Sequence, residues 1–361
     1  QSTVKIDAGL AWGEVSARLE THGVKVIGGR VPSVGVGGLL LGGGYSLFTD
    51  QYGLAIDNIV SHDLVLPNGT FVEVNEQTAP DLFFALKGGF NNFGVVTSFT
   101  LQAFPQTDVW VTAVSYPLDA SDPVHRATEN FVFNNTDLKA AVLNFYGAPS
   151  FNETSLSAVL FYDAPEPPSG VFNDFLSIPG AAVGVSGTIV MYCSLVIVHP
   201  FSNLYVNRTA RHTVPVSHYT VGILDEIKTQ FEKIIFDAAA DNRPFVLIDM
   251  IPEPFTQLNT HSTDSAYPHP PGCPTVLEAH YINAADDDFF VNAIREAQRA
   301  IHARAIEEGQ SFTGDILYNN YAPADTPLEL LYGGNLERLR EIKRRVDPQN
   351  VMELAGGFKI E

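Results

Sequence analysis

The sequence predicts an α+β protein, and three observations support this class. Short strands and helices alternate over residues 3–104. From residue 108 onward, longer strands are separated by helices that carry one apolar face. Hydrophobic residues make up 45% of the 361 residues and charged residues 17%, which is typical of a folded chain long enough for two domains.

The first region predicts small alternating elements. Residues 11–21 place Trp12, Val15 and Leu19 at helical spacing, and Gly23 follows as a stop signal. A Pro-Asn-Gly turn at 67–69 between two alternating runs predicts a β-hairpin. The strands expected here cover residues 3–8, 59–66, 70–74 and 95–104, and the helices residues 11–21 and 78–86.

The second region predicts a sheet covered by helices. Its expected strands are 109–116, 140–146, 155–162, 188–199 and 245–250, and its expected helices are 122–133, 221–238 and 288–308. Asp122 is a candidate N-cap, with Pro123 in the first turn. Residues 252–274 are rich in Pro, His, Ser and Thr and predict a surface loop near a substrate entrance. A final helix is expected over 334–346.

The charge balance limits the possible partners. With 21 basic and 41 acidic residues the formal net charge is −20, so we expect no nucleic acid and no anionic membrane as partner. No apolar run reaches the roughly 18 residues of a membrane span. Four N-x-S/T sequons favour a secreted glycoprotein, although the turn around the first one explains that match equally well: Asn68, Asn134, Asn152 and Asn207.

The stretch 26–58 is the most unusual part of the chain. It holds nine glycines, and no charged residue lies between Arg30 and Asp50. A helix is disfavoured there, because each glycine costs about 1 kcal/mol against alanine. The glycine spacing fits neither the dinucleotide fingerprint nor a P-loop. The stretch therefore predicts either a backbone that lies against a large, flat, partly apolar group or a tight crossing within the core.

Several motifs in a fixed order resemble one family. They are VPSVGVGG at 31–38, LGGGY at 41–45, YGLAIDN at 52–58, DLFFALKGGFNNFGVVT at 81–97, YNNY at 318–321, YGGN at 332–335 and DPQN at 347–350. Together they resemble the FAD-linked oxidases of the vanillyl-alcohol-oxidase superfamily, in the berberine-bridge-enzyme-like branch.

The resemblance implies the domain organisation. Residues 1–107 would be the second half of a PCMH-type FAD-binding domain. Residues 108–314 would be a substrate domain with an antiparallel sheet covered by helices, and residues 315–361 would return to the FAD domain. Because the sequence begins at Gln1 inside such a domain, we expect an N-terminal part that is cleaved or supplied as a separate chain.

The resemblance also implies FAD as cofactor and a set of residues that hold it. The first glycine segment would line the cofactor through Val34, Gly35, Gly37, Gly38, Gly42, Gly43 and Gly44. The second segment would pack against its other end through Gly88, Gly89, Asn92, Gly94 and Val96. Asp57 and Asn58 would brace the loop between them, and Asn320 would face the flavin.

Covalent attachment is the next implication. The family links FAD to a histidine in a segment that these residues do not contain. Many relatives add a bond from a cysteine immediately before a proline, and Val31 holds that position here, which excludes a second bond. Leu39 stands where the family usually has a histidine.

The resemblance implies Tyr321 as the base that takes a proton while hydride leaves the substrate. A phenol with a pKa near 10 needs an activating neighbour, for which Asp249 is one candidate and Glu278 or His280 another. Tyr318, Tyr146 and His280 are further candidate substrate contacts. The competing interpretation is that the aromatic residues are core residues and that the lone polar residues on strands are structural. We expect no metal, because the histidines show no trusted ligand spacing.

The sequence therefore predicts a secreted FAD-dependent oxidase of an alcohol, amine or ring carbon of a small organic molecule, with O₂ as electron acceptor. Two alternatives stay open. One is a dehydrogenase with another acceptor, and the other is a relative that binds flavin or ligand without turnover.

Overall fold

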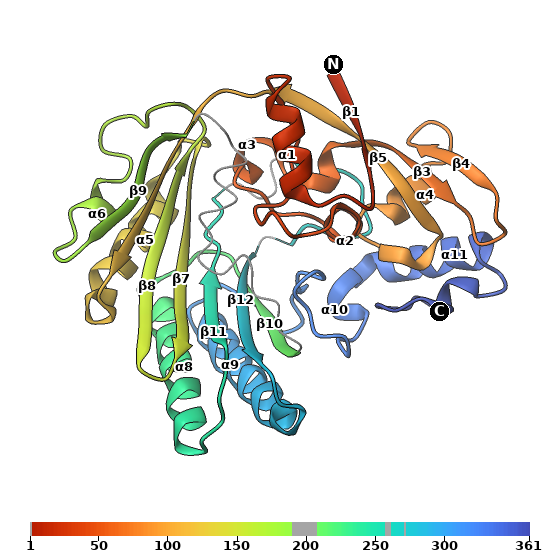
Figure 1. Ribbon diagram of the computed structural model, residues 1–361. Helices are drawn as coiled ribbons and strands as arrows, with labels where there is room; N and C mark the ends of the chain where they lie inside the picture. The colour runs from red at the N-terminus through yellow and green to blue at the C-terminus, as the bar shows by residue number, and fades with distance from the viewer. Residues whose placement is uncertain (1, 190–207, 257–260, 271) are drawn as a thin grey trace.

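The computed structural model describes residues 2–189, 208–256, 261–270 and 272–361. Two antiparallel sheets dominate it: a five-stranded sheet near the N-terminus and a seven-stranded sheet from the middle of the chain (Figure 1). Within the described residues, no helix is both long and apolar enough to cross a bilayer.

The five-stranded sheet has the order β1-β5-β3-β4, and a short β2 pairs with β5. The predicted hairpin is confirmed, because β3 and β4 pair in antiparallel register across the Pro67-Asn68-Gly69 turn. The strands are β1 (Ser2–Asp7), β2 (Val24–Lys25), β3 (Ile59–Val65), β4 (Phe71–Asn75) and β5 (Val95–Pro105), and the helices beside them are α1 (Trp12–Glu20) and α4 (Pro80–Leu86).

The glycine-rich stretch contains a helix, which corrects the expectation that its glycines exclude one. Helix α2 (Val36–Gly42) buries Val36 and Leu40 completely. A Cβ on Gly37 would come within 3.1 Å of the Ala8 carbonyl oxygen, so the glycine allows the helix to lie close to the end of β1. Burial of the apolar side chains offsets the low helix propensity. Helix α3 (Thr49–Tyr52) and a 3₁₀ turn, η1 (Ala55–Asn58), follow.

The seven-stranded sheet has the order β10-β12-β11-β7-β8-β6-β9. Its strands are β6 (Val109–Tyr116), β7 (Ala140–Ser150), β8 (Glu153–Tyr162), β9 (Ala182–Ile189), β10 (Arg208–Val216), β11 (Leu247–Pro252) and β12 (Cys273–Tyr281). The sequence did not predict β10 or β12, and most of the expected strand 188–199 lies outside the described residues.

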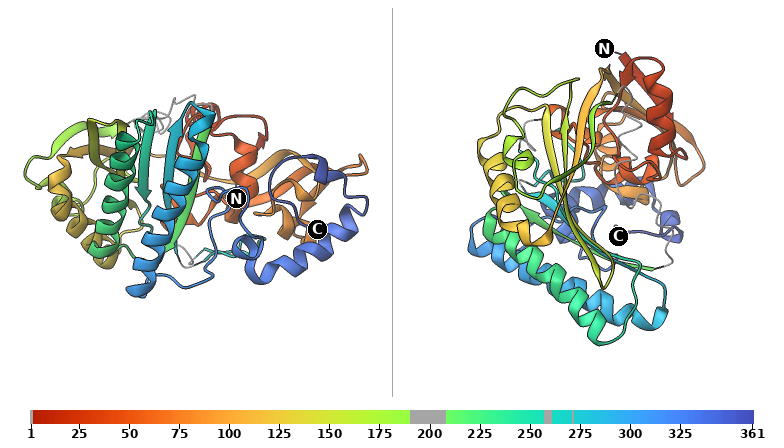
Figure 2. Two further views of the ribbon diagram at one scale, coloured as in Figure 1. Left: turned by 90° about the horizontal axis from the view of Figure 1, so that it is seen from below. Right: turned by 60° about the vertical axis from the view of Figure 1, so that its left-hand side comes forward.

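Three long helices cover one face of this sheet (Figure 2). They are α5 (Ser121–Asn134), α8 (Val221–Ala240) and α9 (Asp287–Glu307), and a short α6 (Asn173–Leu176) accompanies α5. Asp122 lies in the first turn of α5 and not at its N-cap, which is Ala120, so that prediction was wrong by two residues. The helix face leaves the opposite face of the sheet free to line a cavity.

The chain end runs back beside the five-stranded sheet (Figure 1). Helix α10 (Glu329–Tyr332) leads to α11 (Leu336–Val346). The Lys343 ammonium donates to the Asn92 carbonyl oxygen at 3.0 Å and pairs with Asp347 at 2.6 Å. These bonds hold the last helix on the segment that follows α4.

A buried ion pair joins the two sheets. The Lys25 ammonium on β2 lies 2.7 Å from both carboxylate oxygens of Asp163, at the end of β8. Both side chains are buried, and Gln51 donates to the same carboxylate at 3.0 Å. Breaking such a pair leaves an uncompensated buried charge, so it fixes how the glycine-rich stretch faces the larger sheet.

Candidate functional site

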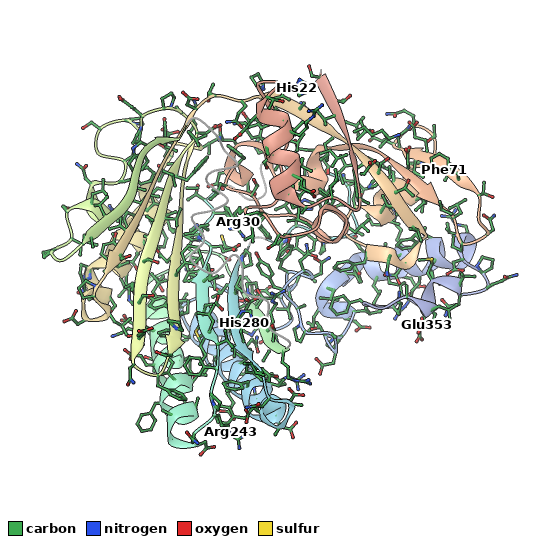
Figure 3. The ribbon with its side chains drawn as sticks, viewed as in Figure 1. His22, Arg30, Phe71, Arg243, His280 and Glu353 are labelled. Atoms are coloured by element: carbon green, nitrogen blue, oxygen red, sulfur yellow. The ribbon has the colours of Figure 1, made fainter. Side chains whose placement is uncertain are left out.

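A cavity of about 460 Å³ lies between the glycine-rich stretch and the free face of the seven-stranded sheet. Arg30 from the glycine-rich stretch and His280 from β12 both line it, and Figure 3 labels the two residues. A volume of this size is in the range of small-molecule sites. The lining residues are Arg30, Val31, Ser33, Val34, Gly35, Gly38, Leu39, Tyr45, Leu143, Phe145, Arg211, Leu247, Asp249, Ile251, Glu253, Val276, Glu278, His280, Tyr318, Asn320 and Tyr321.

Part of the first glycine segment forms an open, mostly apolar wall. Gly35 and Gly38 line the cavity, and a Cβ added to either would meet no atom within 4 Å. Val31, Val34 and Leu39 stand beside them. A side chain at either glycine would therefore project into the cavity, so the wall suits a flat apolar group that lies against backbone.

The other glycines of this segment pack closely against the protein's own residues, and their contact with a cofactor stays a prediction. A Cβ on Gly42 would collide with the Asn320 side chain, and one on Gly43 would come within 2.9 Å of Tyr318. A Cβ on Gly44 would collide with the side chains of Leu39 and Ala55. Gly37 faces the Ala8 carbonyl. These positions allow the C-terminal YNNY motif to approach the bend closely.

The second glycine segment lies outside the lining of this cavity, and its contact with a cofactor stays a prediction. Gly88 packs on Tyr267, Gly89 on the Ala85 carbonyl and Gly94 on the Val65 carbonyl. Val96 is a buried residue of β5. Asn92 donates to the carbonyl oxygens of Gly89 at 2.8 Å and Phe358 at 3.1 Å, and it accepts from the Ile360 N–H. In the structure these residues hold the chain end in place.

Asp57 and Asn58 brace the loop as expected. The Asn58 amide donates to the carbonyl oxygens of Tyr52 and Leu54, both at 2.9 Å. The Asp57 carboxylate accepts from the backbone N–H groups of Leu54 and Thr263 at 2.9 Å. Asp57 thus ties the glycine-rich region to the long loop before β12.

Tyr321 belongs to a cluster with two residues that the sequence did not indicate, in which Glu253 is buried and Arg30 and Tyr321 are half-buried. The Arg30 guanidinium lies 2.5 Å from Glu253 and donates to the Tyr321 hydroxyl at 3.0 Å. The Tyr321 hydroxyl donates to the same Glu253 oxygen at 3.2 Å. Arg30 is the only basic residue of the stretch 26–58, which is a signal that could have found it. No pattern marks Glu253.

The electrostatics of this cluster favour proton exchange. Burial, and then the Glu253 charge, raises the pKa of Tyr321, while the Arg30 guanidinium lowers it. Burial also raises the pKa of Glu253, against the opposing effect of Arg30. Both groups are therefore shifted toward their protonated forms, and they share one hydrogen bond beside a fixed cation.

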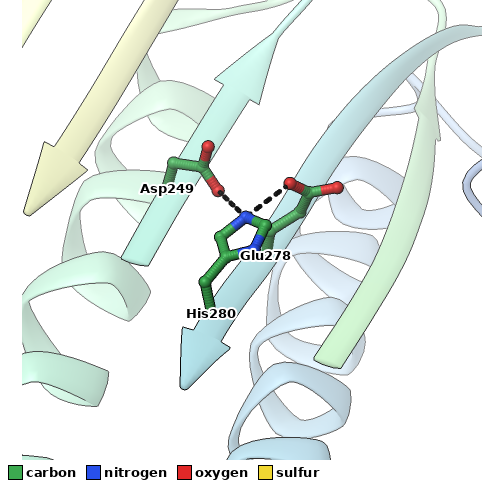
Figure 4. A group of neighbouring side chains, drawn as sticks. All are labelled: Asp249, Glu278 and His280. Carbon is green, nitrogen blue, oxygen red and sulfur yellow. Dashed lines mark hydrogen bonds and ion pairs between the residues drawn. The ribbon is translucent and has the colours of Figure 1, made fainter. Parts of the chain in front are cut away.

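A second polar cluster lies on the sheet side of the cavity (Figure 4). Asp249 on β11 pairs across the strands with Glu278 on β12. The His280 Nε2 atom lies 2.9 Å from a Glu278 oxygen and 3.9 Å from Asp249 Oδ1. Arg211 forms an ion pair with Glu278. No hydrogen bond joins Asp249 to Tyr321, so Glu253, and not the candidate Asp249, is the carboxylate that contacts the phenol.

The two carboxyl groups of this cluster titrate in opposite directions. Burial, and then the Glu278 charge, raises the pKa of Asp249 well above its ordinary value. Burial also opposes ionisation of Glu278, but the Arg211 charge and the His280 hydrogen bond outweigh it and lower the pKa of Glu278 to about 2. The single guanidinium thus compensates one carboxylate of the two.

The remaining predicted contacts divide between the two faces of the sheet. Tyr318 lines the cavity, and its hydroxyl accepts hydrogen bonds from the Gly44 N–H and the Asn320 amide, both at 2.9 Å. Tyr146 packs on Phe231 of α8 and bonds to His125. Side chains alternate along a strand, so Phe145 faces the cavity and Tyr146 faces the helices. This placement argues against Tyr146 as a substrate contact.

The glycine wall and the C-terminal tyrosine both lie in segments that match known family profiles. The FAD binding domain profile matches residues 1–75, and the profile described as berberine and berberine like matches residues 317–356.

Sequence relatives extend over the whole chain. The FAD-dependent monooxygenase drtC of Aspergillus calidoustus is 31% identical over 99% of this chain and 70% of that protein. An uncharacterized FAD-linked oxidoreductase of Arthroderma benhamiae is 40% identical over 49% of this chain and 35% of its own length. The chain belongs to the FAD-linked oxidoreductases of the vanillyl-alcohol-oxidase and berberine-bridge-enzyme family.

Solved structures share the fold. The BBE-like 1 protein of Physcomitrella patens superposes with a TM-score of 0.76 at 20% identity, over 97% of this chain and 76% of that one. The carbohydrate oxidase of Microdochium nivale gives a TM-score of 0.74 at 20% identity, with the same coverage.

Proposed function

We propose that the cavity binds the flavin ring of FAD against Gly35 and Gly38 and a small organic substrate between that ring and the seven-stranded sheet. The main support for this proposal is the empty space beside the backbone at Gly35 and Gly38, because a side chain at either position would occupy the cavity. Bound FAD would supply a two-electron acceptor for hydride. Val31 brings no thiol to the site, so a covalent bond, if the full-length protein has one, would come from elsewhere.

Tyr321 is the proposed proton acceptor. As hydride leaves the substrate carbon, the proton of the attached O–H or N–H group passes to the Tyr321 oxygen. The phenol's own proton can pass at the same time to Glu253, which accepts its hydrogen bond at 3.2 Å. Arg30 holds both oxygens in position through bonds of 3.0 and 2.5 Å. The substrate leaves as a carbonyl or imine, and Glu253 ends the step protonated.

O₂ is the proposed final electron acceptor, with hydrogen peroxide as the product. The relatives named as monooxygenases favour a second candidate reaction, in which one oxygen atom enters the substrate. Turnover under ¹⁸O₂ separates the two reactions. Labelled peroxide with unlabelled product supports the oxidase, and label in the organic product supports the monooxygenase. Reduction of the flavin without reaction with O₂ supports a dehydrogenase.

We also propose that the protein is secreted and glycosylated and that its own N-terminal segment completes the FAD site. The sequon asparagines Asn68, Asn134 and Asn152 are exposed, which glycosylation requires. Asn207 lies outside the described residues. Loss of mass on glycosidase treatment of the secreted protein tests this proposal, and a protein of unmodified mass in the medium would contradict it.

The Tyr321→Phe variant tests the proposed mechanism. Anaerobic mixing of the full-length holoprotein with substrate should show flavin reduction about 10² to 10⁴ times slower than in the wild type, the range for loss of a general base. Tyr332→Phe is the matched control, because it removes a buried hydroxyl with no hydrogen-bond partner away from the cavity lining. Equal reduction rates in both variants would remove Tyr321 from the role.

A further inference from the structure

We infer that the cluster of Asp249, Glu278, His280 and Arg211 is a substrate anchor that selects an uncharged oxygen, with the Asp249 carboxyl as hydrogen-bond donor. The ligand class is a molecule with a hydroxyl, phenol or carbonyl group at the sheet side of the cavity. The inference rests on the proposed function, and it deepens it by separating oxygenated substrates from amines.

Among the members of the cluster, Asp249 has a carboxyl oxygen that can still form a hydrogen bond with a ligand. His280 uses Nε2 on Glu278 at 2.9 Å, and its Nδ1 lies 3.2 Å from the Thr209 hydroxyl. Glu278 is held by His280 and Arg211. Asp249 is 3% exposed, lines the cavity and has a buried Oδ1 without a hydrogen-bond partner. Leaving such an atom unsatisfied is unfavourable, and a ligand that donates to it can recover that cost.

The charges around Asp249 decide its protonation state. On the sheet it meets Glu278 and His280 from β12 and Arg211 from β10. Across the cavity, Arg30 is already paired with Glu253.

Arg211 pairs with Glu278, and His280 lies nearer to Glu278, at 2.9 Å, than to Asp249, at 3.9 Å, so a second carboxylate charge at Asp249 would be buried and only weakly compensated. The raised pKa of Asp249 agrees with this count, because burial and the Glu278 charge both favour its neutral form.

A neutral carboxylic acid offers a substrate oxygen a hydrogen-bond donor, but it offers an ammonium group no opposite charge. Its O–H donates to a substrate oxygen, and its C=O accepts from a substrate hydroxyl. An ammonium group would find a neutral acid and the positive charge of Arg211. A divalent cation is the other ligand that three such groups suggest, since their ligand atoms lie within 4.8 Å of one another. The Arg211 ion pair with Glu278 opposes that second positive charge.

The first arm of the test needs no substrate. Infrared spectra of the full-length holoprotein in D₂O at pH 7 should show the C=O stretching band of a protonated carboxylic acid, and Asp249→Asn should remove it. An unchanged spectrum in Asp249→Asn would overturn the inference. Elemental analysis accompanies this arm, and one equivalent of a divalent metal that is lost in Asp249→Asn would overturn it in favour of a metal site.

The second arm uses matched probes, a series of arylmethanols and the corresponding arylmethylamines, in anaerobic flavin-reduction titrations. The alcohols should bind wild type about tenfold tighter than the amines, as expected for one added hydrogen bond to a buried group. Asp249→Leu should weaken alcohol binding about tenfold with a limiting reduction rate within about threefold of wild type. Asp249→Asn keeps a donor and should keep alcohol binding at every pH.

The outcomes of the two arms are distinct. Amines that bind as tightly as alcohols, or a lowered limiting rate in Asp249→Leu with unchanged binding, would overturn the anchor. If neither series reduces the flavin in any variant while the infrared band behaves as expected, the proposed function fails and the neutral carboxyl stands.

Discussion

Two glycines of the first segment and two of the second have opposite surroundings. At Gly35 and Gly38 the space beside the backbone is open and belongs to the cavity. At Gly88 and Gly94 it is filled by Tyr267 and by the Val65 carbonyl. A glycine motif therefore indicates that another group packs close to the backbone. Only the structure shows whether that group belongs to a ligand or to the protein itself.

The largest expected effect separates the two segments by stability. Gly94 has φ +145° and its missing Cβ would lie 2.5 Å from the Val65 carbonyl oxygen, so Gly94→Ala should lower the free energy of unfolding by about 2–4 kcal/mol. Denaturant titration measures this loss. Gly9→Ala is the control, because nothing lies within 4 Å of that position. Equal free energies of unfolding for Gly94→Ala and Gly9→Ala would contradict the close packing described at Gly94.

A buried histidine makes the second segment's surroundings sensitive to acid. His62 on β3 lies between the rings of Phe83 and Phe99, and neither ring nitrogen has a partner. Burial lowers the pKa of His62 to about 3, so below pH 6.5 the unfolded chain binds a proton that the folded chain does not. At pH 5 this costs about 2 kcal/mol of stability.

The His62→Leu variant tests this cost. The variant should gain stability over the wild type as the pH falls from 7 to 5, measured by denaturant titration at each pH. A difference between the two proteins that does not change over this pH interval would show that His62 binds protons equally in the folded and the unfolded chain, and would contradict the lowered pKa.

The smallest expected effect lies beside the first segment. Burial opposes ionisation of Asp57, but the His269 and Thr263 hydrogen bonds outweigh it and lower its pKa. A lowered pKa adds stability above the unfolded value near 3.9, and that stability is lost as the pH falls through the folded value. Asp57→Asn should therefore be about 1 kcal/mol less stable at pH 7 and should approach the wild type as the pH falls below the unfolded value. A stability difference between Asp57→Asn and the wild type that grows as the pH falls would contradict the lowered pKa of Asp57.

Local sequence patterns predicted the elements that are stabilised mainly by interactions between residues close in sequence. The hairpin at 67–69 and the helices α8 and α9 follow from turn chemistry and from one apolar face. Helix α2 did not follow, because burial of Val36 and Leu40 outweighs the propensity of three glycines. Propensity gave the wrong prediction where tertiary packing decides the structure.

The candidate site was predicted only in part, because its contacts are distant in sequence. Arg30 and Glu253 are 223 residues apart, and no periodicity links them. The strand register decides which side chains share a face: Asp249 stands opposite Gly147, and Met250 opposite Tyr146. A sequence without known pairing cannot show that Asp249 and Tyr146 lie on opposite faces.

The flavin content of full-length Gly38→Leu tests the central claim most directly. Leucine is a better helix former than glycine by up to about 1 kcal/mol, so α2 should fold, while the new side chain would enter the cavity. The account predicts the melting temperature of flavin-free wild type and a flavin-to-protein absorbance ratio below about a tenth of the wild-type value, since a blocked site binds no ring. A folded variant with a full complement of flavin would contradict it.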